Sequence, residues 1–288
     1  MPCPYSTWGI MAGNAMIVRL IQCKSALAES GLADWCINCY VGCEHGCRYC
    51  YARYMKRFTG HNEPWGDFVD VRLNGPEVLA REVRRKKRGR VFLSSVCDGW
   101  QPLEREHQVT RGCLRILIEN GWPVSILTKS ALVRRDFDLL ERARDLTLGV
   151  TVTAADEKVR QKIEPCASAT AERLDALAEA GRRRIEIWAF LGPFIPGLTD
   201  TQDNIEWLVS RIAPLPITHF YVDRLNFRSG VASSVRATLK RDFPAALPVF
   251  DAVANDPGAD EVYQERLGKR ARSLAAKYGI EDKIRCGL

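Results

Sequence analysis

The stretch CYVGCEHGCRYCYAR, residues 39–53, places four cysteines within twelve positions, among tyrosines, glycines and a histidine. Cys43, Cys47 and Cys50 follow the spacing C-x3-C-x2-C, directly after a segment that predicts a strand. Three closely spaced thiolates can hold three irons of a four-iron cluster, whereas a cluster held wholly by protein normally takes four cysteines. The spacing therefore predicts an iron–sulfur cluster with one iron open to another ligand.

A zinc site is the alternative use of the same cysteines. Cys36 and Cys39, together with Cys47 and Cys50, form the pattern C-x2-C-x7-C-x2-C. That spacer is shorter than the about 15–20 residues usual between zinc-binding pairs, and zinc would leave Cys43 unused. We instead expect Cys36 and Cys39 to be buried in the core, where cysteine behaves as a small apolar residue. Cys39 remains a less favoured fourth cluster ligand.

Outside this stretch the chain predicts alternating strands and helices. Amphipathic patterns typical of helices separate apolar runs rich in β-branched residues, which span Trp35 to Val41, Arg90 to Cys97, Val124 to Thr128, Leu146 to Thr153, Arg184 to Leu191 and His219 to Leu225. This alternation favours parallel strands covered by helices. About six units are too few for a closed eight-stranded barrel. We predict an α/β fold, a partial (β/α)6 TIM-type barrel with a C-terminal helical extension.

We expect the chain to have three parts. They are an N-terminal extension over residues 1–33, the partial barrel over 34–230, and a C-terminal helical extension over 231–288, where the alternation stops. In a barrel of this kind the loops that follow the strands line the functional face. The cysteine motif would therefore lie in the pocket.

Composition sets the expected compartment. The chain lacks a basic leader followed by an apolar run and a cleavage site, and it lacks a run of ~18 apolar residues that would span a membrane. We therefore expect a cytoplasmic protein without a membrane partner. Eleven cysteines in a reducing compartment favour metal binding over a disulfide framework. The net charge of +7 is compatible with an anionic partner but does not demand one.

The motif, with aromatic Tyr49 between its last two cysteines, resembles the radical S-adenosylmethionine (SAM) superfamily. More narrowly, CEHGCRYCYAR followed by DGWQPLE, TKSALVRRDFDLL, IEP and FIPGLTD is similar to the spore photoproduct lyase-like group, over roughly residues 34–225. The resemblance implies a [4Fe-4S] cluster on Cys43, Cys47 and Cys50 and SAM bound at the open iron. It also implies an external one-electron reductant of the flavodoxin or ferredoxin type.

The same resemblance implies the reaction. Reductive cleavage of SAM would give a 5'-deoxyadenosyl radical that abstracts hydrogen from a substrate. A nucleic-acid lesion or modified base is the leading substrate class. A small molecule or a peptide is the alternative, and a non-catalytic iron–sulfur or zinc module is the reading from another functional class.

Contacts to SAM should come from strand ends. Tyr49 resembles the residue that packs near the adenine in the superfamily, although core packing would also explain it. Where the superfamily often has Gly-Glu to bind the ammonium group of SAM, this chain has SSVCDGW. Ser95 and Asp98 are therefore the candidates for that contact.

Two further strand ends carry polar candidates. Lys129 and Ser130 end the third predicted strand, and Lys129 could meet the SAM carboxylate or be a solvated loop lysine. Thr151 and Thr153 close the fourth strand on one face. Either hydroxyl could contact the ribose, although threonine also simply favours strands.

Cys97 is the candidate catalytic residue. Spore photoproduct lyase resembles this chain in the same region and uses a cysteine there as hydrogen donor to a product radical. We predict that Cys97 relays hydrogen, with an inert buried thiol as the alternative. Glu164, in IEP, and His107 are weaker candidates, for which structural or exposed roles are expected.

Basic residues fall into two groups. The runs at residues 81–90 and 182–184 precede strands and therefore lie on the face opposite the cluster. The other group follows strands and could contact phosphates, with Trp65 and Trp100 stacking on bases, or could be ordinary helix surface. Its members are Arg48, Arg53, Lys56, Arg57, Arg134, Arg135, Arg224 and Arg228.

Overall fold

The computed structural model describes residues 16–227 and 230–286. Its larger sheet has eight strands in the order β11-β10-β9-β8-β7-β6-β3-β2. Neighbouring strands from β3 to β11 pair in parallel, and β2 pairs antiparallel with β3. In chain order the strands are β2 (Ala28–Glu29), β3 (Trp35–Ile37), β6 (Val91–Leu93), β7 (Val124–Thr128), β8 (Leu146–Val152), β9 (Glu186–Phe194), β10 (Ile217–Arg224) and β11 (Ile284–Cys286).

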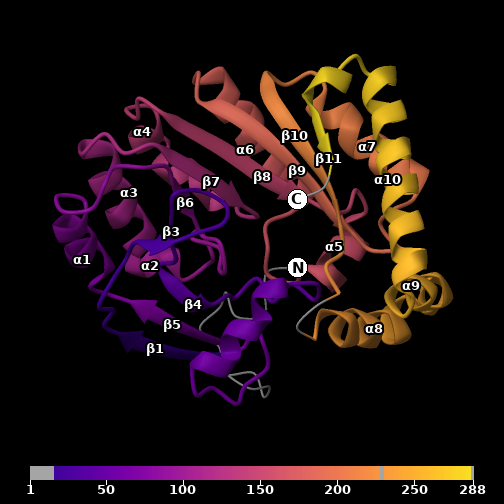
Figure 1. Ribbon diagram of the computed structural model, residues 1–288, viewed down its shortest axis with the longest axis horizontal. Coiled ribbons are helices and arrows are strands. Elements are labelled where there is room, and N and C mark those ends of the chain that lie inside the picture. Colours follow the sequence, from indigo (N-terminus) through magenta and orange to yellow (C-terminus); the bar gives the residue numbers. More distant parts are fainter. Residues whose placement is uncertain (1–15, 228–229, 287–288) are drawn as a thin grey trace.

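Helices follow the strands and cover one face of this sheet (Figure 1). They are α1 (Gly75–Glu82), α2 (Glu104–His107), α3 (Val109–Glu119), α4 (Phe137–Leu140), α5 (Glu157–Ile163), α6 (Thr170–Arg182) and α7 (Gln202–Ile212), with the 3₁₀ helix η2 (Ala131–Asp136). The 3₁₀ helix η1 (Tyr51–Phe58) packs instead against β4 (Tyr40–Gly42). The six predicted strands correspond to β3, β6, β7, β8, β9 and β10, so the partial barrel is confirmed.

The C-terminal helices lie on the right and lower right in Figure 1; the long last helix packs against β10 and β11, and the first of them packs against α5. They are α8 (Val231–Asp242), η3 (Pro244–Ala246), α9 (Leu247–Ala254), α10 (Pro257–Lys277) and η4 (Glu281–Lys283). The last strand, β11, then extends the barrel sheet. The proposed division at residues 33 and 230 stays a prediction.

The first predicted strand, Trp35 to Val41, is wrong as a single element. The chain leaves the barrel sheet after β3, because the Asn38 side chain binds the loop after β6: its Nδ2 donates to Ser95 Oγ at 3.0 Å, and its Oδ1 accepts from Val96 N at 2.9 Å. A second sheet then forms with the order β1-β5-β4, on the left in Figure 1. Its strands are β1 (Ile17–Ile21), β4 (Tyr40–Gly42) and β5 (Phe68–Arg72).

Alternation along the strands decides which side chains reach the site. In β7, Val124, Ile126 and Thr128 are buried, whereas Ser125 and Leu127 are half-buried on the other face. Fully burying an apolar side chain of this size contributes roughly 1.5–3 kcal/mol, so the helix-covered face fixes the register. The opposite face, inside the open barrel, is left to bind other groups.

Candidate active site

The three motif cysteines lie on one loop after β4. Cys43 and Cys47 are buried and Cys50 is partly buried, and Cys50 N donates to Cys47 O at 3.1 Å. Burial raises the pKa of all three thiols, to about 12 for Cys47, and each of Cys43 and Cys47 is raised further by its cysteine neighbours. As bare thiols they stay protonated, and only a bound metal's positive charge makes them thiolates.

Two glycines hold this cluster loop, residues 43–50, against the turn before β5. Gly46 and Gly66 have positive φ values of 57° and 108°. A Cβ atom on Gly66 would lie 2.9 Å from the Cα of Gly46. The two backbones therefore touch, and only glycine allows this approach.

The zinc set is not assembled. Cys39 lies in the main core, where it contacts the Cys113 thiol, whereas Cys47 lies in a separate apolar group near α8. Among the described residues, no three His, Cys, Asp or Glu side chains converge on a single-ion site. A four-iron cluster is different, because each cysteine binds its own iron. The buried loop with Cys43, Cys47 and Cys50 fits that larger group.

The DGWQPLE segment supports one side of the cluster loop. Glu44 N donates to Gln101 Oε1 at 2.8 Å, and a Glu44 carboxylate oxygen accepts from Leu103 N at 2.5 Å. Burial raises the pKa of Glu44 to about 7 and lowers that of His45 to about 4. His45 Nδ1 lies 3.4 Å from Asp98 Oδ2.

Asp98 joins the ends of two strands. Its Oδ1 accepts from Trp100 N at 2.9 Å and Thr128 Oγ1 at 2.7 Å, and its Oδ2 accepts from Lys129 N at 2.7 Å. A SAM ammonium group would therefore have to donate to an Asp98 carboxylate that already accepts three hydrogen bonds. Ser95 Oγ accepts from Asn38 Nδ2 at 3.0 Å. Both residues remain predictions for the ammonium contact.

A network of buried charged side chains joins the segments DGWQPLE and RRDFDLL. Arg135 donates to both Glu104 and Asp136, each fully buried. Tyr40 also donates to Glu104, and Trp100 Nε1 donates to Asp136 Oδ2 at 2.8 Å. Breaking such a network would leave an unpaired buried charge. The network fixes the DGWQPLE segment, which in turn is hydrogen-bonded to Glu44 of the cluster loop.

The IEP segment supports the other side. Arg48 N donates to Ile163 O at 2.8 Å, and Cys166 N donates to His45 O at 3.3 Å. Between them, Glu164 is fully buried and accepts from Arg173, which is also fully buried. Glu164 therefore has a structural role, as expected.

The Tyr49 hydroxyl belongs to this buried network. It donates to Glu164 and lies 3.2 Å from Thr153 Oγ1, which itself donates to Gly192 O at 2.6 Å. Lys129 Nζ lies 5.8 Å from the centre of the Tyr49 ring. Tyr49 and Thr153 are thus fixed, and only the ring of Tyr49 is left to contact a ligand.

The remaining predicted residues differ in how far they are engaged. Ser130 caps η2, because its Oγ accepts from Leu132 N at 3.2 Å. Thr151 Oγ1 is buried and makes no hydrogen bond within the described chain. Burial acts to lower the pKa of Lys129, but Cys47 when it is a thiolate and the nearby carboxylates of Glu164 and Asp98 raise it. Lys129 therefore stays cationic beside the cluster loop.

Cys97 lies next to the cluster loop. It packs against the apolar group that contains Cys43, Trp65 and Phe68, and its Sγ lies 3.7 Å from Asn38 Oδ1. Burial raises the pKa of its thiol. The thiol is therefore protonated and close to the predicted cluster. His107, by contrast, lies in α2, after the buried Glu104.

Sequence reasoning missed Arg173 as a site residue. It lies in α6 at helical spacing from Leu177 and Ala180, both fully buried. A charged residue on the apolar face of a helix is the signal that could have identified it.

Several residues that could contact phosphates or bases are engaged or buried within the protein, and their contacts with nucleic acid stay predictions. Arg134 pairs with Glu179 and Arg224 with Asp260, in addition to the Arg135 network. Trp65 and Trp100 are buried and have no face for a base. Arg228 lies outside the described residues. The basic residues that remain are Arg48, Arg53, Lys56 and Arg57.

Comparison with known proteins places this site in a family. The radical SAM superfamily model matches residues 37–208. This chain belongs to the radical SAM superfamily. Members use a [4Fe-4S] cluster and SAM, and these two groups are the cofactors of this protein. Members also need an electron donor. The family implies an enzyme.

The relatives in sequence are mostly uncharacterised. A protein of Mycobacterium tuberculosis is 30% identical over 274 residues, 90% of this chain and 80% of the relative. The radical SAM Nα-GlyT isomerase of Pseudomonas phage M6 is 23% identical, over 83% of this chain and 50% of the phage protein. A probable dual-specificity RNA methyltransferase of Clostridium acetobutylicum is 24% identical over 52% of this chain and 41% of its own.

Solved structures confirm the fold. Spore photoproduct lyase complexed with dinucleoside spore photoproduct has a TM-score of 0.67 at 12% identity, covering 93% of this chain and 81% of that one. Streptococcus suis SuiB bound to the precursor peptide SuiA has a TM-score of 0.53 at 10% identity, covering 95% and 49%.

Two expectations on compartment have partial outcomes. In the described chain, no helix is both long and apolar enough to cross a bilayer. Eight of the described cysteines carry free thiols, whereas Cys166 is disulfide-bonded. A cytoplasmic location stays a prediction.

Proposed function

We propose that this protein is a radical SAM enzyme that removes hydrogen from a damaged or modified base in nucleic acid, with its cluster on Cys43, Cys47 and Cys50. When bound, the cluster and SAM supply a 5'-deoxyadenosyl radical, by one-electron cleavage of the sulfonium carbon–sulfur bond. The observation that carries the proposal is the buried three-thiol loop, which strand-end segments hold from both sides.

Residues around the loop would bind SAM in a fixed orientation. Lys129 is the cation for its carboxylate, and the unpaired Thr151 hydroxyl is the group for its ribose. Tyr49 offers its ring while its hydroxyl is held by Glu164. Asp98 lies close enough to the loop, through His45, to meet the ammonium group. Ser95, Ser130 and Thr153 complete the predicted set, and of these Thr153 lies 3.2 Å from the Tyr49 hydroxyl.

Cys97 would end the reaction by hydrogen transfer. Its S–H lies beside the group that contains Cys43, so a substrate radical formed near the cluster lies within its reach. The thiol would give a hydrogen atom to that radical and become a thiyl radical, which one electron from the external reductant and one proton would restore to the thiol. In a Cys97→Ala variant the substrate radical would be quenched by other donors, so product distribution should change. An unchanged yield and distribution would refute this role.

The substrate class is supported by what related proteins act on. The structural neighbour was solved with a dinucleoside photoproduct, and one relative is named as an RNA methyltransferase. A peptide is the second candidate, because SuiB was solved with a precursor peptide. Salt-dependent binding separates the two, since phosphate contacts release counterions.

The test measures 5'-deoxyadenosine under anaerobic conditions with reductant and SAM. We expect photodamaged or modified oligonucleotides to raise its production above the level without substrate. Enhancement by peptides alone would contradict the nucleic-acid assignment. A loaded, reducible cluster that yields no 5'-deoxyadenosine with any substrate would favour a non-catalytic binding module.

A further inference from the structure

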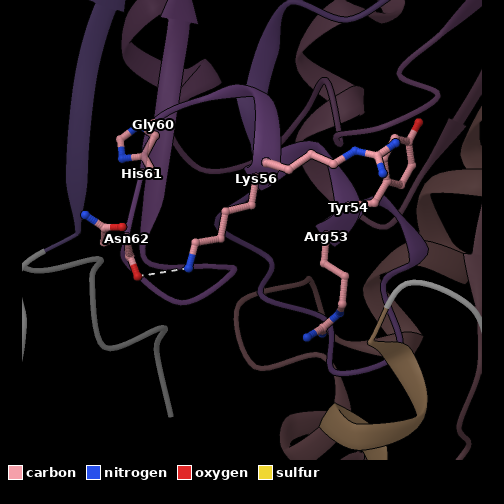
Figure 2. A pocket seen from close by; sticks show the side chains of 7 residues that line it. Arg53, Tyr54, Lys56, Gly60, His61 and Asn62 are labelled. Carbon is pink, nitrogen blue, oxygen red and sulfur yellow. Dashed lines mark hydrogen bonds between the residues drawn. The ribbon is translucent and has the colours of Figure 1, made fainter.

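An open pocket lies directly beside the cluster loop. It has a volume of about 500 Å³ and is lined by residues of η1 and of the turn that follows, namely Arg53, Tyr54, Lys56, Arg57, Gly60, His61 and Asn62. In Figure 2 the side chains of Arg53 and Lys56 extend from η1 toward the same side. The volume is within the ~300–1,000 Å³ typical of ligand sites.

The three cations of this pocket lack acidic partners in the described chain. Lys56 Nζ donates to a backbone carbonyl, Asn62 O, at 2.9 Å, as the dashed line in Figure 2 shows. The Arg57 guanidinium lies 4.6 Å from the centre of the Phe58 ring. Arg134 and Arg224, which were predicted in the same role, are instead paired with carboxylates. The pocket therefore has positive charge that no carboxylate of the described chain pairs with.

The carboxylates of Glu63 and Asp70, near the pocket, contact the His61 ring. Its Nδ1 lies 2.9 Å from Glu63 and its Nε2 lies 2.8 Å from Asp70, while its ring stacks on Phe68 at 4.1 Å. These contacts fix the floor of the pocket. Both acidic groups are thereby engaged with His61.

Aromatic side chains lie exposed on the same helix. Phe58 is 68% exposed and Tyr51 is 44% exposed. Exposed aromatic rings interleaved with unpaired cations are the pattern of single-strand nucleic-acid surfaces, where rings stack on bases and cations follow the phosphates. A peptide chain with neutral backbone offers no such repeat of negative charge.

Arg53 connects the pocket to the cluster loop. Its Nε donates to Cys50 O at 3.0 Å, and its NH2 nitrogen donates to Arg48 O at 2.9 Å and Cys47 O at 3.3 Å. Its Cδ lies 3.9 Å from the position of a Cβ on Gly230, at the start of α8. Within residues 16–227 and 230–286, its Nη1 makes no hydrogen bond, which leaves this nitrogen for a ligand in the pocket.

We propose that this η1 pocket binds the sugar–phosphate backbone of an unpaired nucleic-acid strand. Arg53, Lys56 and Arg57 contact phosphates, and Phe58 stacks on a flanking base. Because Arg53 also holds the carbonyls of Cys47 and Cys50, a bound phosphate is fixed relative to the cluster. The inference rests on the proposed function and adds the site that positions the strand.

The experiment measures binding of labelled single-stranded DNA and RNA of one sequence to the cluster-loaded protein at several salt concentrations. The variant Lys56→Ala/Arg57→Ala removes two phosphate contacts. The negative slope of log K against log salt should therefore become less steep by about 1.4, at about 0.7 per contact. The matched control is Lys87→Ala/Arg88→Ala, which removes the same charge from exposed positions before β6. It should keep the wild-type slope.

A second variant tests stacking separately from charge. Phe58→Ala should weaken binding about 5- to 150-fold, which corresponds to about 1–3 kcal/mol per stacked base, with the slope unchanged. Equal slope losses in both double variants, or no loss in either, would overturn the pocket while leaving the proposed function intact. If the wild type binds neither DNA nor RNA, the pocket and the nucleic-acid substrate both fail. Binding of only one of the two nucleic acids identifies the source of the strand.

Discussion

The buried pair of Glu164 and Arg173 should be the strongest single electrostatic support of the candidate site. Both side chains are fully buried, and Glu164 also accepts from Tyr49. The substitution Glu164→Gln preserves shape but removes the negative charge. Arg173 would then be a buried cation without a counter-charge, which is costly in a low-dielectric interior.

The structure gives the size of this effect. Burial acts to raise the pKa of Glu164, but the charge and hydrogen bond of Arg173 lower it from 4.5 to about 2. A difference of about 2.5 pKa units corresponds to about 3 kcal/mol of stability at pH 7. Removing one partner of a buried pair typically costs about 3–5 kcal/mol. Each kcal/mol shifts the melting temperature by about 2–4 °C in a protein of comparable size, so we expect a loss of about 6–12 °C.

The assay is urea and thermal unfolding of the apoprotein, with Glu265→Gln as control. That control breaks the exposed pair of Glu265 and Lys269, which should contribute less than about 1 kcal/mol. Because the folded pKa of Glu164 is depressed, its contribution is present above pH 4.5 and is lost as pH falls toward 2. The difference between wild type and Glu164→Gln should shrink to about 1 kcal/mol at pH 3.

Two results would refute this reasoning. One is a cost of Glu164→Gln no larger than that of Glu265→Gln. The other is a difference between wild type and variant that stays constant between pH 7 and pH 3. Either would mean that the buried charge is compensated by groups other than Arg173.

Three further predictions concern the cluster and SAM. The Trp65 indole Nε1 is buried without a hydrogen-bond partner in the described chain and lies in the apolar group that contains Cys43. A bound cluster would offer it a sulfur acceptor, so Trp65→Phe should make the cluster potential more negative by about 40 mV, for about 1 kcal/mol of lost hydrogen bonding to the reduced cluster; an unchanged potential in a redox titration would contradict this. Thr151→Val should raise the KM for SAM about fivefold, for a bond of about 1 kcal/mol, with the melting temperature unchanged; an unchanged KM would assign the hydroxyl to packing alone. Gly66→Ala should lower the iron content per chain, because its Cβ would lie 2.9 Å from the cluster loop, whereas Gly31→Ala meets nothing within 4 Å and should keep full iron; equal iron in both would refute the close approach.

The architecture followed from local patterns in the sequence. Apolar β-branched runs and amphipathic segments alternate regularly, and β7 and β8 lie where these patterns place them. The pattern failed where side chains direct the backbone. Asn38 diverts the chain into the second sheet by bonding across to Ser95 and Val96. No periodicity of residues 35–41 carries that information.

The site was predictable in its cysteines and less so in their surroundings. The spacing of Cys43, Cys47 and Cys50 predicts one loop, and the structure has one loop. Whether an aromatic ring is buried or exposed depends instead on tertiary packing. Trp100 was expected to stack on bases, yet it is fully buried and bonded to Asp136. Sequence shows that such a residue follows a strand but not which way its ring turns.

The central claim is that Cys43, Cys47 and Cys50 hold the cluster. Its most direct test is iron content and 5'-deoxyadenosine formation after anaerobic reconstitution, compared between Cys43→Ala and Cys36→Ala. Both changes remove one buried thiol from the same part of the chain. The account predicts that Cys43→Ala loses the four-iron cluster and all 5'-deoxyadenosine, whereas Cys36→Ala keeps both. A cluster and product that survive Cys43→Ala but not Cys36→Ala would contradict it.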